Sequence, residues 1–370
     1  MTLLISNEDA DRLLTMPAVI EALEGSYRDL ASGEAVCRPR IDVELPGGDP
    51  GQLYRWGTME GGGPGYFAIR MKSDIVHWQE ENGVATREKY CVRPGLFCGL
   101  IFLFSTQTGE PLALLNDGVI QHMRVGGDSG IGVKYMAREN SEVVGMLGSG
   151  GMARSHIKAF LAVLPGIRRL QVYSPTRTNR EKFATEVAGR YGIEAVAADA
   201  PEAIYEGADI VAAVTDAARP VLDGNRLEAG CHVVNIGAGG SPDQRTIERC
   251  DVYLRFGNAP APRGRPELAP DDEFLSYTAD AAMPVLENRP RGAREDAHGV
   301  LAPEKLVSLA EIFEDRSRGR SGADQITYSE RGNLQGAQFW AVASVVYEAA
   351  IKAGLGRDLP TEWFVQDIRN

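Results

Sequence analysis

The sequence predicts an α/β protein with two parts, a Rossmann dinucleotide-binding domain and a second domain of the α+β class completed by the C-terminal helix. Three observations predict it. A glycine-rich turn links an apolar run to a helix start at residues 143–153. Mostly apolar strands then alternate with helical segments, whereas the amino-terminal part mixes an amphipathic helix with β-prone runs. The chain of 370 residues is also longer than one typical domain.

The glycine-rich turn is typical of a dinucleotide phosphate site. Gly148 and Gly150 allow backbone angles that other residues avoid and let a pyrophosphate approach the main chain, while the small Ala153 lets the helix pack on its strand. The first amides of the helix and its positive end would face the phosphates. Because glycines also mark ordinary strand-to-helix turns, this motif alone is weak. The predicted cofactor-binding residues here are Gly148, Ser149, Gly150, Gly151, Met152 and Ala153.

The segments that follow strengthen this interpretation. Residues 170–173 form a short β-prone run, and residues 179–191 have helical spacing. Residues 209–215 and 231–237 are mostly apolar strands of the kind that parallel sheets bury on both faces. Ligands of such sheets bind beyond the carboxyl ends of the strands. The residues predicted to share that edge with the glycine turn are Thr215, Asn235 and Gly237.

The end of the second strand favours NADP(H), with NAD(H) as the alternative. Chains that bind NAD carry an acidic residue about 20 residues beyond the glycines, where it accepts the ribose hydroxyl. This chain has no acid there. Arg177 offers a planar, permanently charged group suited to a 2′-phosphate, with Ser174 and Thr176 as hydroxyl donors. A helix cap beside surface arginines would explain the same residues.

Composition and charge argue against several classes of protein. Hydrophobic residues make up 44% of the chain, enough for two cores, and the formal net charge of −12 gives no sign of a nucleic-acid partner. The five cysteines are odd in number and lack CxxC spacing, so we expect neither a disulfide framework nor a metal site, and a cytoplasmic location. The first residues do not combine a charged region with a following apolar segment, so we do not expect secretion. The uncharged stretch 334–347 is too short to span a membrane and predicts a core or interface helix that ends near Gly354.

The amino-terminal part has a different organisation. A helix with one apolar face precedes Gly33, and β-prone runs follow at residues 66–72 and 100–104. Residues 74–93 between these runs are polar, and we expect them to form a surface loop. Later in the chain, residues 258–300 are rich in proline, arginine and acids, which predicts an irregular excursion or lid.

Several segments of the chain resemble the ornithine cyclodeaminase and mu-crystallin family. They occur in family order over most of the chain, and together they are specific although each is weak alone. The matching segments are Arg38-Pro39-Arg40, Met71-Lys72, Thr108-Gly109-Glu110-Pro111-Leu112-Ala113-Leu114, Arg124 ahead of a helix through Tyr135, Gly148-Ser149-Gly150-Gly151-Met152-Ala153, Gly207-Ala208-Asp209-Ile210-Val211, Gly319-Arg320 and Ile326-Thr327.

The resemblance implies a domain order and an assembly. Residues 1–124 with 325–370 would form a substrate-binding and dimerisation domain, and residues 125–324 the Rossmann NAD(P)-binding domain. A protein similar to this family is expected to be a homodimer whose substrate domains pair through an extended sheet, with the active site in the cleft between domains. The resemblance also implies chemistry on a small α-amino or α-imino acid with a bound nicotinamide.

The resemblance further implies which residues bind substrate. The carboxylate-binding arginines of the family correspond to Arg40 and Arg124, and its substrate-contacting lysine corresponds to Lys72. Two guanidinium groups can hold a carboxylate bidentately, and a lysine beside them with a lowered pKa can transfer a proton at the imine or amine nitrogen. We therefore assign all three residues to substrate binding and Lys72 to catalysis. Further candidates, which a solvated loop explains equally well, are Asp74, His77 and Glu88.

Two departures from the family bear on the reaction. After the fifth strand, family members that release ammonia or dehydrogenate alanine carry an aspartate, and ketimine reductases like mu-crystallin carry a serine. This chain has Gly240 there, with Ser241 and Asp243 as substitutes only if the loop shifts. The start of the C-terminal helix, residues 335–338, also lacks the usual acid. Because glycine offers no side chain to manage a departing amine, a cyclodeaminase is disfavoured.

Three functions remain open at this point. The favoured one is an NADP(H)-dependent oxidoreductase that reduces an α-imino acid (ketimine) or oxidises the corresponding α-amino acid. Hydride transfer needs only a positioned nicotinamide, a held carboxylate and a proton donor. The second is an ornithine cyclodeaminase-type lyase that releases ammonia without net redox change. The third is a non-catalytic binder of a dinucleotide or small ligand. The presence of Lys72 and Arg124 favours catalysis.

Overall fold

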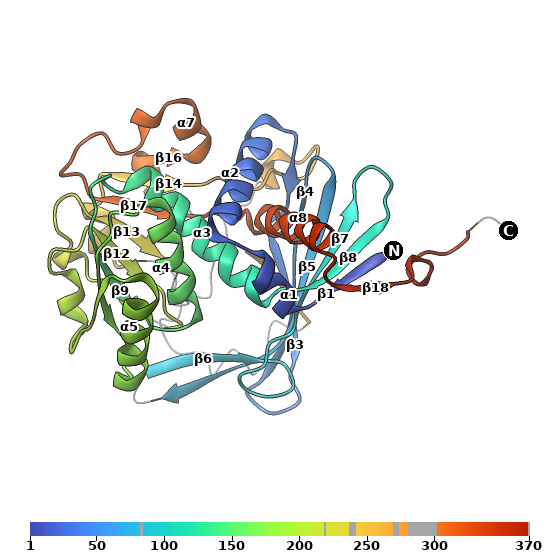
Figure 1. The fold of residues 1–370 in the computed structure, drawn as a ribbon, viewed down its shortest axis with the longest axis horizontal. Coiled ribbons are helices and arrows are strands. Elements are labelled where there is room, and N and C mark those ends of the chain that lie inside the picture. Colours follow the sequence, from blue (N-terminus) through green and yellow to red (C-terminus); the bar gives the residue numbers. More distant parts are fainter. Residues whose placement is uncertain (82–83, 218–219, 237–241, 269–273, 280–301, 369–370) are drawn as a thin grey trace.

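Two β-sheets organise the chain, one mixed and one parallel (Figure 1). The glycine turn belongs to the parallel sheet, and helices pack on both sheets. The predicted α/β class is therefore confirmed. This computed structural model describes residues 1–81, 84–217, 220–236, 242–268, 274–279 and 302–368, with only the backbone described for 78–81, 84–87 and 274.

The parallel sheet has the strand order of a Rossmann fold. Its order is β11-β10-β9-β12-β13-β17-β14-β16, and all its pairs are parallel. The order reverses at β9, and such a reversal is where this fold binds dinucleotides. Its strands are β9 (Val143–Leu147), β10 (Arg169–Tyr173), β11 (Glu194–Ala197), β12 (Ile210–Ala213), β13 (His232–Asn235), β14 (Val252–Arg255), β16 (Leu306–Ser308) and β17 (Thr327–Glu330).

The mixed sheet is antiparallel at its centre. Its order is β15-β3-β4-β5-β7-β8-β1-β18, with β2 paired to β4 and β6 paired to β5. Its strands are β1 (Thr2–Ile5), β2 (Val36–Cys37), β3 (Arg40–Pro46), β4 (Leu53–Gly62), β5 (Tyr66–Glu81), β6 (Val84–Tyr90), β7 (Gly99–Ser105), β8 (Pro111–Asn116), β15 (Phe274–Thr278) and β18 (Arg357–Leu359).

The helices begin and end at recognisable cap residues. Ser6 and Asp9 form a capping box at the first helix, and Gly33 and Gly354 end α2 and α8 in the left-handed conformation that glycine favours. The predicted end of the last helix is thus confirmed. The helices are α1 (Asn7–Leu13), α2 (Met16–Ser32), α3 (Gly118–Met136), α4 (Gly151–Val163), α5 (Arg177–Tyr191), α6 (Gln244–Arg249), α7 (Leu309–Glu314) and α8 (Gln335–Ala353).

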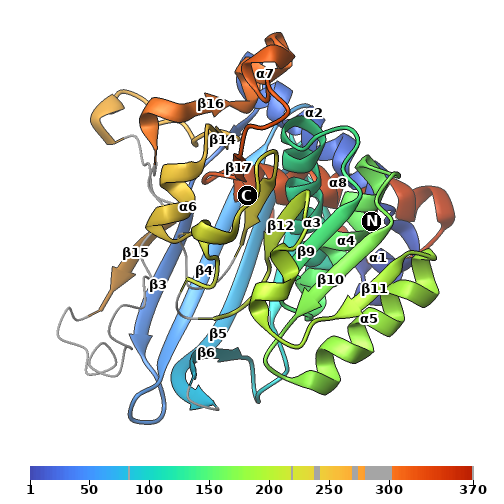
Figure 2. The same ribbon diagram turned by 90° about the vertical axis from the view of Figure 1, so that its left-hand side faces the viewer.

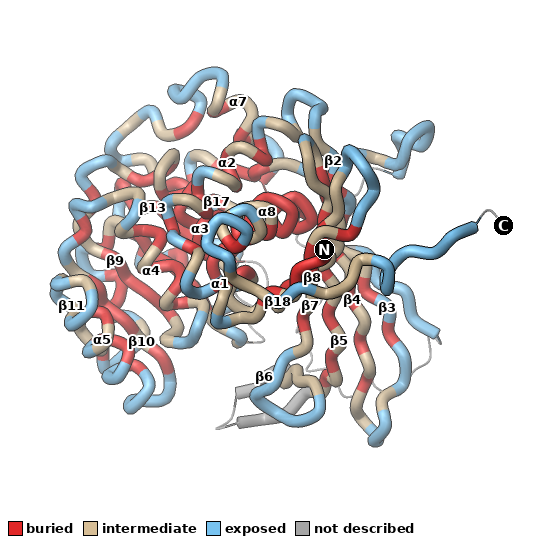
Figure 3. Tube along the Cα trace, turned by 45° about the vertical axis from the view of Figure 1, so that its right-hand side comes forward, coloured by how far each residue is buried: buried red, intermediate tan, exposed pale blue. Residues whose placement is uncertain are grey.

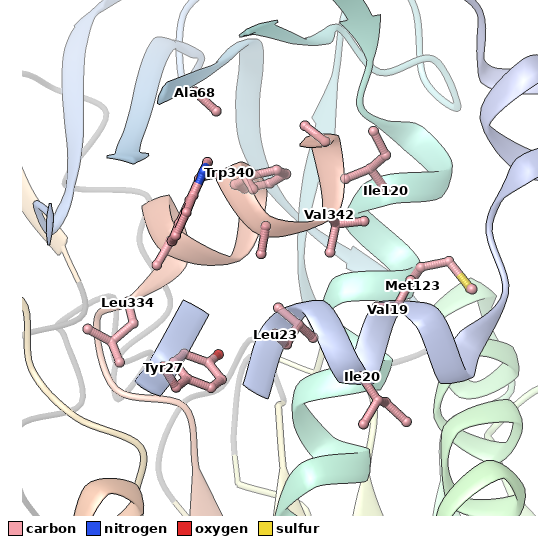
Figure 4. Close-up of a cluster of buried hydrophobic side chains, with 14 of the residues drawn as sticks. Val19, Ile20, Leu23, Tyr27, Ala68, Ile120, Met123, Leu334, Trp340 and Val342 are labelled. Carbon is pink, nitrogen blue, oxygen red and sulfur yellow. The ribbon is translucent and has the colours of Figure 1, made fainter. Parts of the chain in front are cut away.

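The C-terminal helix α8 returns to the mixed sheet and forms the centre of its core. It packs on β4 and β5 and against α2, and Figure 4 shows Trp340 and Val342 among apolar side chains of α2 and α3. The approach to β4 is very close, since a Cβ at Gly336 would lie 1.9 Å from the Glu60 carbonyl oxygen. The uncharged stretch is therefore a core helix, as predicted.

The expectation of a surface loop at residues 74–93 is wrong. β5 continues to Glu81 and pairs with β6 as an antiparallel hairpin. Alternate residues of β5 face the interior, so Asp74 and Val76 are buried although the segment reads as polar. Helix α3 also begins at Gly118, ahead of Arg124, which places that arginine inside the helix.

Two strands cross the predicted domain boundaries. β17 lies within the range 325–370 predicted for the substrate domain, yet it pairs with β13 and β14 of the parallel sheet. β15 lies within the range predicted for the Rossmann domain, yet it pairs in parallel with β3 of the mixed sheet (Figure 2). The division at residues 124 and 325 remains a prediction. Within the described parts of the chain, no helix combines the length and apolar character needed to cross a bilayer.

The buried face of the mixed sheet changes character along its width. Along β4, buried residues alternate with less buried ones, as the tube in Figure 3 shows for the neighbouring strands as well. Under α8 this face is apolar, with Ala68 and Met59 in the core. Towards β3 it carries buried charges instead, which form the candidate site described below.

Candidate active site

The glycine turn between β9 and α4 has the geometry of a phosphate-binding loop. Gly148 has φ +116°, and a Cβ there would lie 2.1 Å from the Val214 carbonyl oxygen. Ala153 is fully buried against the sheet. At Gly150, by contrast, a Cβ would meet nothing within 4 Å. The protein itself therefore leaves open the space in front of Gly150, which fits the close approach of a pyrophosphate.

Two side chains that the sequence did not indicate hold this turn and the neighbouring loop after β10 in place. Arg154 donates to the carbonyl oxygens of Ser149 and Gly150, each at 3.1 Å, and pairs with Glu186 at 2.7 Å. Arg180 donates to the Ser174 carbonyl at 2.9 Å. Because Arg154 binds main-chain oxygens of the glycine turn, it fixes the backbone of that turn and leaves its amides for a ligand, and Arg180 does the same for the loop after β10.

The residues predicted to contact the adenosine end lie near this turn. The hydroxyls of Ser149 and Ser174 are 2.8 Å apart, so the two loops meet. Thr176 precedes α5 as its N-cap residue without a capping hydrogen bond. The Arg177 side chain is 73% exposed and its Nε lies 2.7 Å from Glu181. An exposed pair of this kind is weak, so Arg177 can exchange it for a phosphate.

The carboxyl ends of the next strands carry the other predicted cofactor residues. Thr215 follows β12 and accepts a hydrogen bond from the Ala217 amide at 3.2 Å. Asn235 ends β13 and lines a cavity of about 70 Å³. Gly237 and Gly240 lie outside the described residues. The placed residues fit a dinucleotide lying across the switch point of the sheet.

Lys72 lies in a buried cluster of charges on β3, β4 and β5. Its Nζ is 3.1 Å from Asp74 Oδ2 and 3.8 Å from Asp42 Oδ1. Arg40 holds the carboxylate of Asp42 with two nitrogens, with Nε at 2.9 Å. Lys72 and Asp42 can approach each other because Gly57 between them has no side chain. A Cβ at Gly57 would lie 2.4 Å from Cε of Lys72 and 2.6 Å from Asp42 Oδ1. The structure therefore brings Arg40 and Lys72 together, as the resemblance implied.

The electrostatics of this cluster prepare Lys72 for proton transfer. Burial, reinforced by the positive charge of Arg40, lowers the pKa of Lys72 to about 7 against the opposing effect of its carboxylates. Burial alone would raise the pKa of Asp42, but Arg40, Lys72 and Arg55 together hold it well below its usual range. Lys72 can thus exchange a proton near neutral pH beside the Asp42 carboxylate, which stays charged.

Arg124 belongs to a second cluster next to the first. Its guanidinium donates to Gln121 at 2.8 Å and to Gln338 of α8, and lies 4.4 Å above the ring of Phe339. Arg70 lies 5.2 Å from the same ring, two residues before Lys72 on the same buried face of β5. The two clusters therefore adjoin along β5 and α8, although no direct contact joins Arg124 to Arg40 among the described interactions.

Several buried polar residues of the site escaped the sequence prediction. Asp117, at the start of α3, pairs with Arg70 at 2.5 Å. Asp128 lies one turn beyond Arg124 and lines the same cavity as Asn235. Asp42 neutralises Lys72 together with Asp74, which the sequence had indicated only as a candidate on a loop. Nothing in the sequence distinguishes these carboxylates from surface ones, although a strand pattern over residues 66–81 would have placed Asp74 inside.

Of the remaining candidates, His77 and Glu88 form a register pair of the β5–β6 hairpin. The His77 ring packs edge-on against Tyr90 at 5.9 Å. Neither residue has a described contact with the Lys72 cluster, so the structure does not bring them into the site.

Comparison with known proteins agrees with this geometry. The profile of the ornithine cyclodeaminase/mu-crystallin family matches residues 2–353. An alanine dehydrogenase of Archaeoglobus fulgidus is 27% identical over 363 residues, covering 96% of this chain and 97% of its own. A Δ1-pyrroline-2-carboxylate reductase of Bacillus cereus is 29% identical over 259 residues, covering 70% of this chain and 73% of its own.

A solved structure shows the same fold. The Δ1-pyrroline-2-carboxylate reductase of Thermococcus litoralis, in complex with NADH and L-proline, superposes with a TM-score of 0.72 at 24% identity. The match covers 97% of this chain and 100% of that one. At this level of identity the likeness establishes the fold of the whole chain.

Proposed function

Because the chain belongs to the ornithine cyclodeaminase/mu-crystallin family, we propose that it is an NAD(P)-dependent oxidoreductase that reduces an α-imino acid or oxidises the corresponding α-amino acid. The observation that carries this proposal is the buried Lys72 ammonium beside Arg40, in a chain that also holds an open dinucleotide loop. Relatives named alanine dehydrogenase and Δ1-pyrroline-2-carboxylate reductase support it.

Each residue of the site has a role in this reaction. Arg40 and Arg124 bind the α-carboxylate, which orients the substrate carbon. Lys72 gives a proton to the imine nitrogen in reduction and receives one in oxidation. Asp42 and Asp74 keep the lysine charged until it reacts. A bound nicotinamide supplies or accepts the hydride.

Product analysis separates this proposal from its two alternatives. The purified protein with NADPH should reduce Δ1-pyrroline-2-carboxylate with one cofactor consumed per imine, and it should release no ammonia from ornithine at catalytic NAD(P). The physical reason is that hydride delivery needs no side chain at Gly240, whereas managing a departing amine does. Proline and ammonia formed from ornithine would instead establish a cyclodeaminase. Tight NADPH binding without turnover of any imino acid would indicate a binding protein.

For the cofactor, we propose a preference for NADP(H), supported by Arg177, Ser174 and Thr176. NADPH should bind at least about tenfold more tightly than NADH, because one charge-assisted phosphate contact contributes ~1.5–3 kcal/mol. Titration of both cofactors measures this ratio in the wild type and in Arg177→Ala, where it should approach one. Arg190→Ala, in the last turn of the same helix, is the matched control and should keep the preference. Equal affinities in the wild type would show that the enzyme uses NAD(H) equally well.

We also propose that the chain forms a homodimer through the mixed sheet. Val43 and Leu45 of β3 and Leu275 and Tyr277 of β15 are exposed apolar residues on neighbouring strands, with Tyr277 59% exposed. A contiguous apolar patch of this kind is typical of an interface. Light scattering should give twice the mass of the chain, and Tyr277→Asp should shift the equilibrium towards monomer.

A further inference from the structure

A groove beside helix α4 gathers charged side chains that do not pair with one another. α4 lies between α3 and α5 (Figure 1), and a cavity of about 220 Å³ is lined by residues of these three helices and by Asp11 of α1. Lys158 of α4 and Arg190 of α5 also line it. Among the described interactions, none of these three side chains has an ion pair within 4 Å. The groove therefore presents two cations and one anion that are free to meet a ligand.

The ammonium of Lys158 is half-buried without a strong hydrogen-bond acceptor. Its Nζ donates to Sδ of Met123 at 3.8 Å, and a thioether is a weak acceptor. Burial, reinforced by the positive charge of Arg190, lowers the pKa of Lys158, and Asp11 only partly offsets this effect. An anion between Lys158 and Arg190 would accept their hydrogen bonds and remove the repulsion between them.

The groove also has an apolar floor. Met123 of α3, Ile157 of α4 and Val187 of α5 are buried beneath it, and the half-buried side chains of Val119 and Tyr191 line its sides. An apolar cavity of about 150 Å³ is large enough for benzene. The volume of about 220 Å³ therefore has room for a branched or aromatic side chain together with a charged group.

The groove is separate from the two sites described above. The described residues that line it include neither Lys72 nor the arginines Arg40 and Arg124. Gly151 and Arg154 line the end of the groove at the start of α4, whereas Lys158 follows Gly151 by seven residues, about 10 Å further along the helix axis. A ligand held at Lys158 thus leaves the dinucleotide loop free.

We propose that this groove binds a free α-amino acid with an apolar side chain, as a second ligand site of the protein. The carboxylate lies between Lys158 and Arg190, the ammonium faces Asp11, and the side chain packs on the apolar floor. A ligand with both charges complements all three groups. A simple carboxylate would leave Asp11 beside an anion, and a simple amine would leave the two cations unpaired. This inference goes beyond the reductase function and does not depend on it, because the groove holds none of the residues assigned to catalysis.

The test measures the binding of L-leucine by calorimetry. L-Leucine should bind the wild type, and its affinity should fall at least about tenfold in Lys158→Met, which removes one charge-assisted contact. Lys182→Met, at an exposed position of α5, is the matched control and should bind L-leucine as the wild type does. N-acetyl-L-leucine and 3-methylbutylamine each lack one of the two charges, so both should bind at least about tenfold more weakly than L-leucine.

Two further variants keep the test decisive if Lys158→Met does not fold. Arg190→Ala should weaken the binding of L-leucine by a similar factor, whereas Arg40→Leu, in the catalytic site, should leave it unchanged. Binding that survives Lys158→Met and Arg190→Ala but is lost in Arg40→Leu would place the amino acid in the catalytic site and overturn the inference. Equal affinities for L-leucine and N-acetyl-L-leucine would overturn the role of Asp11. The inference would also be wrong if neither L-leucine nor L-phenylalanine bound the wild type, and imine reduction would still be tested by the product analysis above.

Discussion

Lys72→Met should lower kcat/KM for imine reduction by about 10²–10⁴-fold, the usual range for removal of a general acid. Methionine keeps the length of the side chain but has no proton to give. Binding of NADPH should be unchanged, because Lys72 lies on β5 and the phosphate loop on the other sheet. Lys352→Met, on the exposed end of α8, is the control for loss of a lysine. An unchanged kcat with a raised KM alone would remove Lys72 from the chemistry.

The pH dependence of the rate should also show that Lys72 transfers the proton. Reduction needs the ammonium form, which is present below the pKa of Lys72, so the rate should fall as the pH rises through about 7. Oxidation of the amino acid needs the neutral amine and should rise over the same range. Lys72→Arg keeps the positive charge beside Asp42 and Asp74 but cannot release its proton, so it should be inactive although folded. Rates of reduction and oxidation that do not change near pH 7 would contradict the assignment of Lys72 as the proton-transfer group.

Gly148→Ala and Gly150→Ala should both weaken cofactor binding, but only Gly148→Ala should lower the stability of the protein. At Gly148 the φ of +116° is strained for alanine, and the new Cβ would lie 2.1 Å from the Val214 carbonyl oxygen. The strain alone costs roughly 1–3 kcal/mol, so both the melting temperature and cofactor binding should fall. Gly150 has φ −82° and ψ −164°, which alanine adopts, and free space around its Cβ position.

Gly150→Ala should therefore keep the melting temperature and lose cofactor affinity by at least about tenfold, because the methyl group occupies the space of the pyrophosphate. Calorimetry with NADPH and thermal unfolding of both variants measure the contrast. Normal NADPH affinity in a folded Gly150→Ala protein would place the dinucleotide elsewhere. Gly189→Ala, at an exposed and open position of α5, controls for the substitution itself.

The sequence was informative where local rules decide the structure. The apolar strands and the glycine turn predicted the Rossmann sheet, and the cap residues marked the ends of α2 and α8. It misled at residues 74–93, because a polar segment with one buried face looks like a loop until its partner strands are known. The pairing of β15 with β3 likewise joins segments far apart in the chain, which no local pattern reveals.

By itself the sequence determined the fold class and the dinucleotide loop, because backbone propensity and turn motifs are encoded locally. Arg40, Lys72 and Arg124 were predicted only through the resemblance of their segments to a known family. The tertiary structure alone decided which carboxylates are buried. Asp42 lies beside Lys72 only because β3, β4 and β5 are in register across Gly57. Asp74 lies there because it follows Lys72 by two residues on the buried face of β5. Asp128 shares a cavity with Asn235 and Tyr328 only because α3 packs on β13 and β17. A pKa depends on burial and on neighbours in space, so the chemistry of this site appears only in the folded chain.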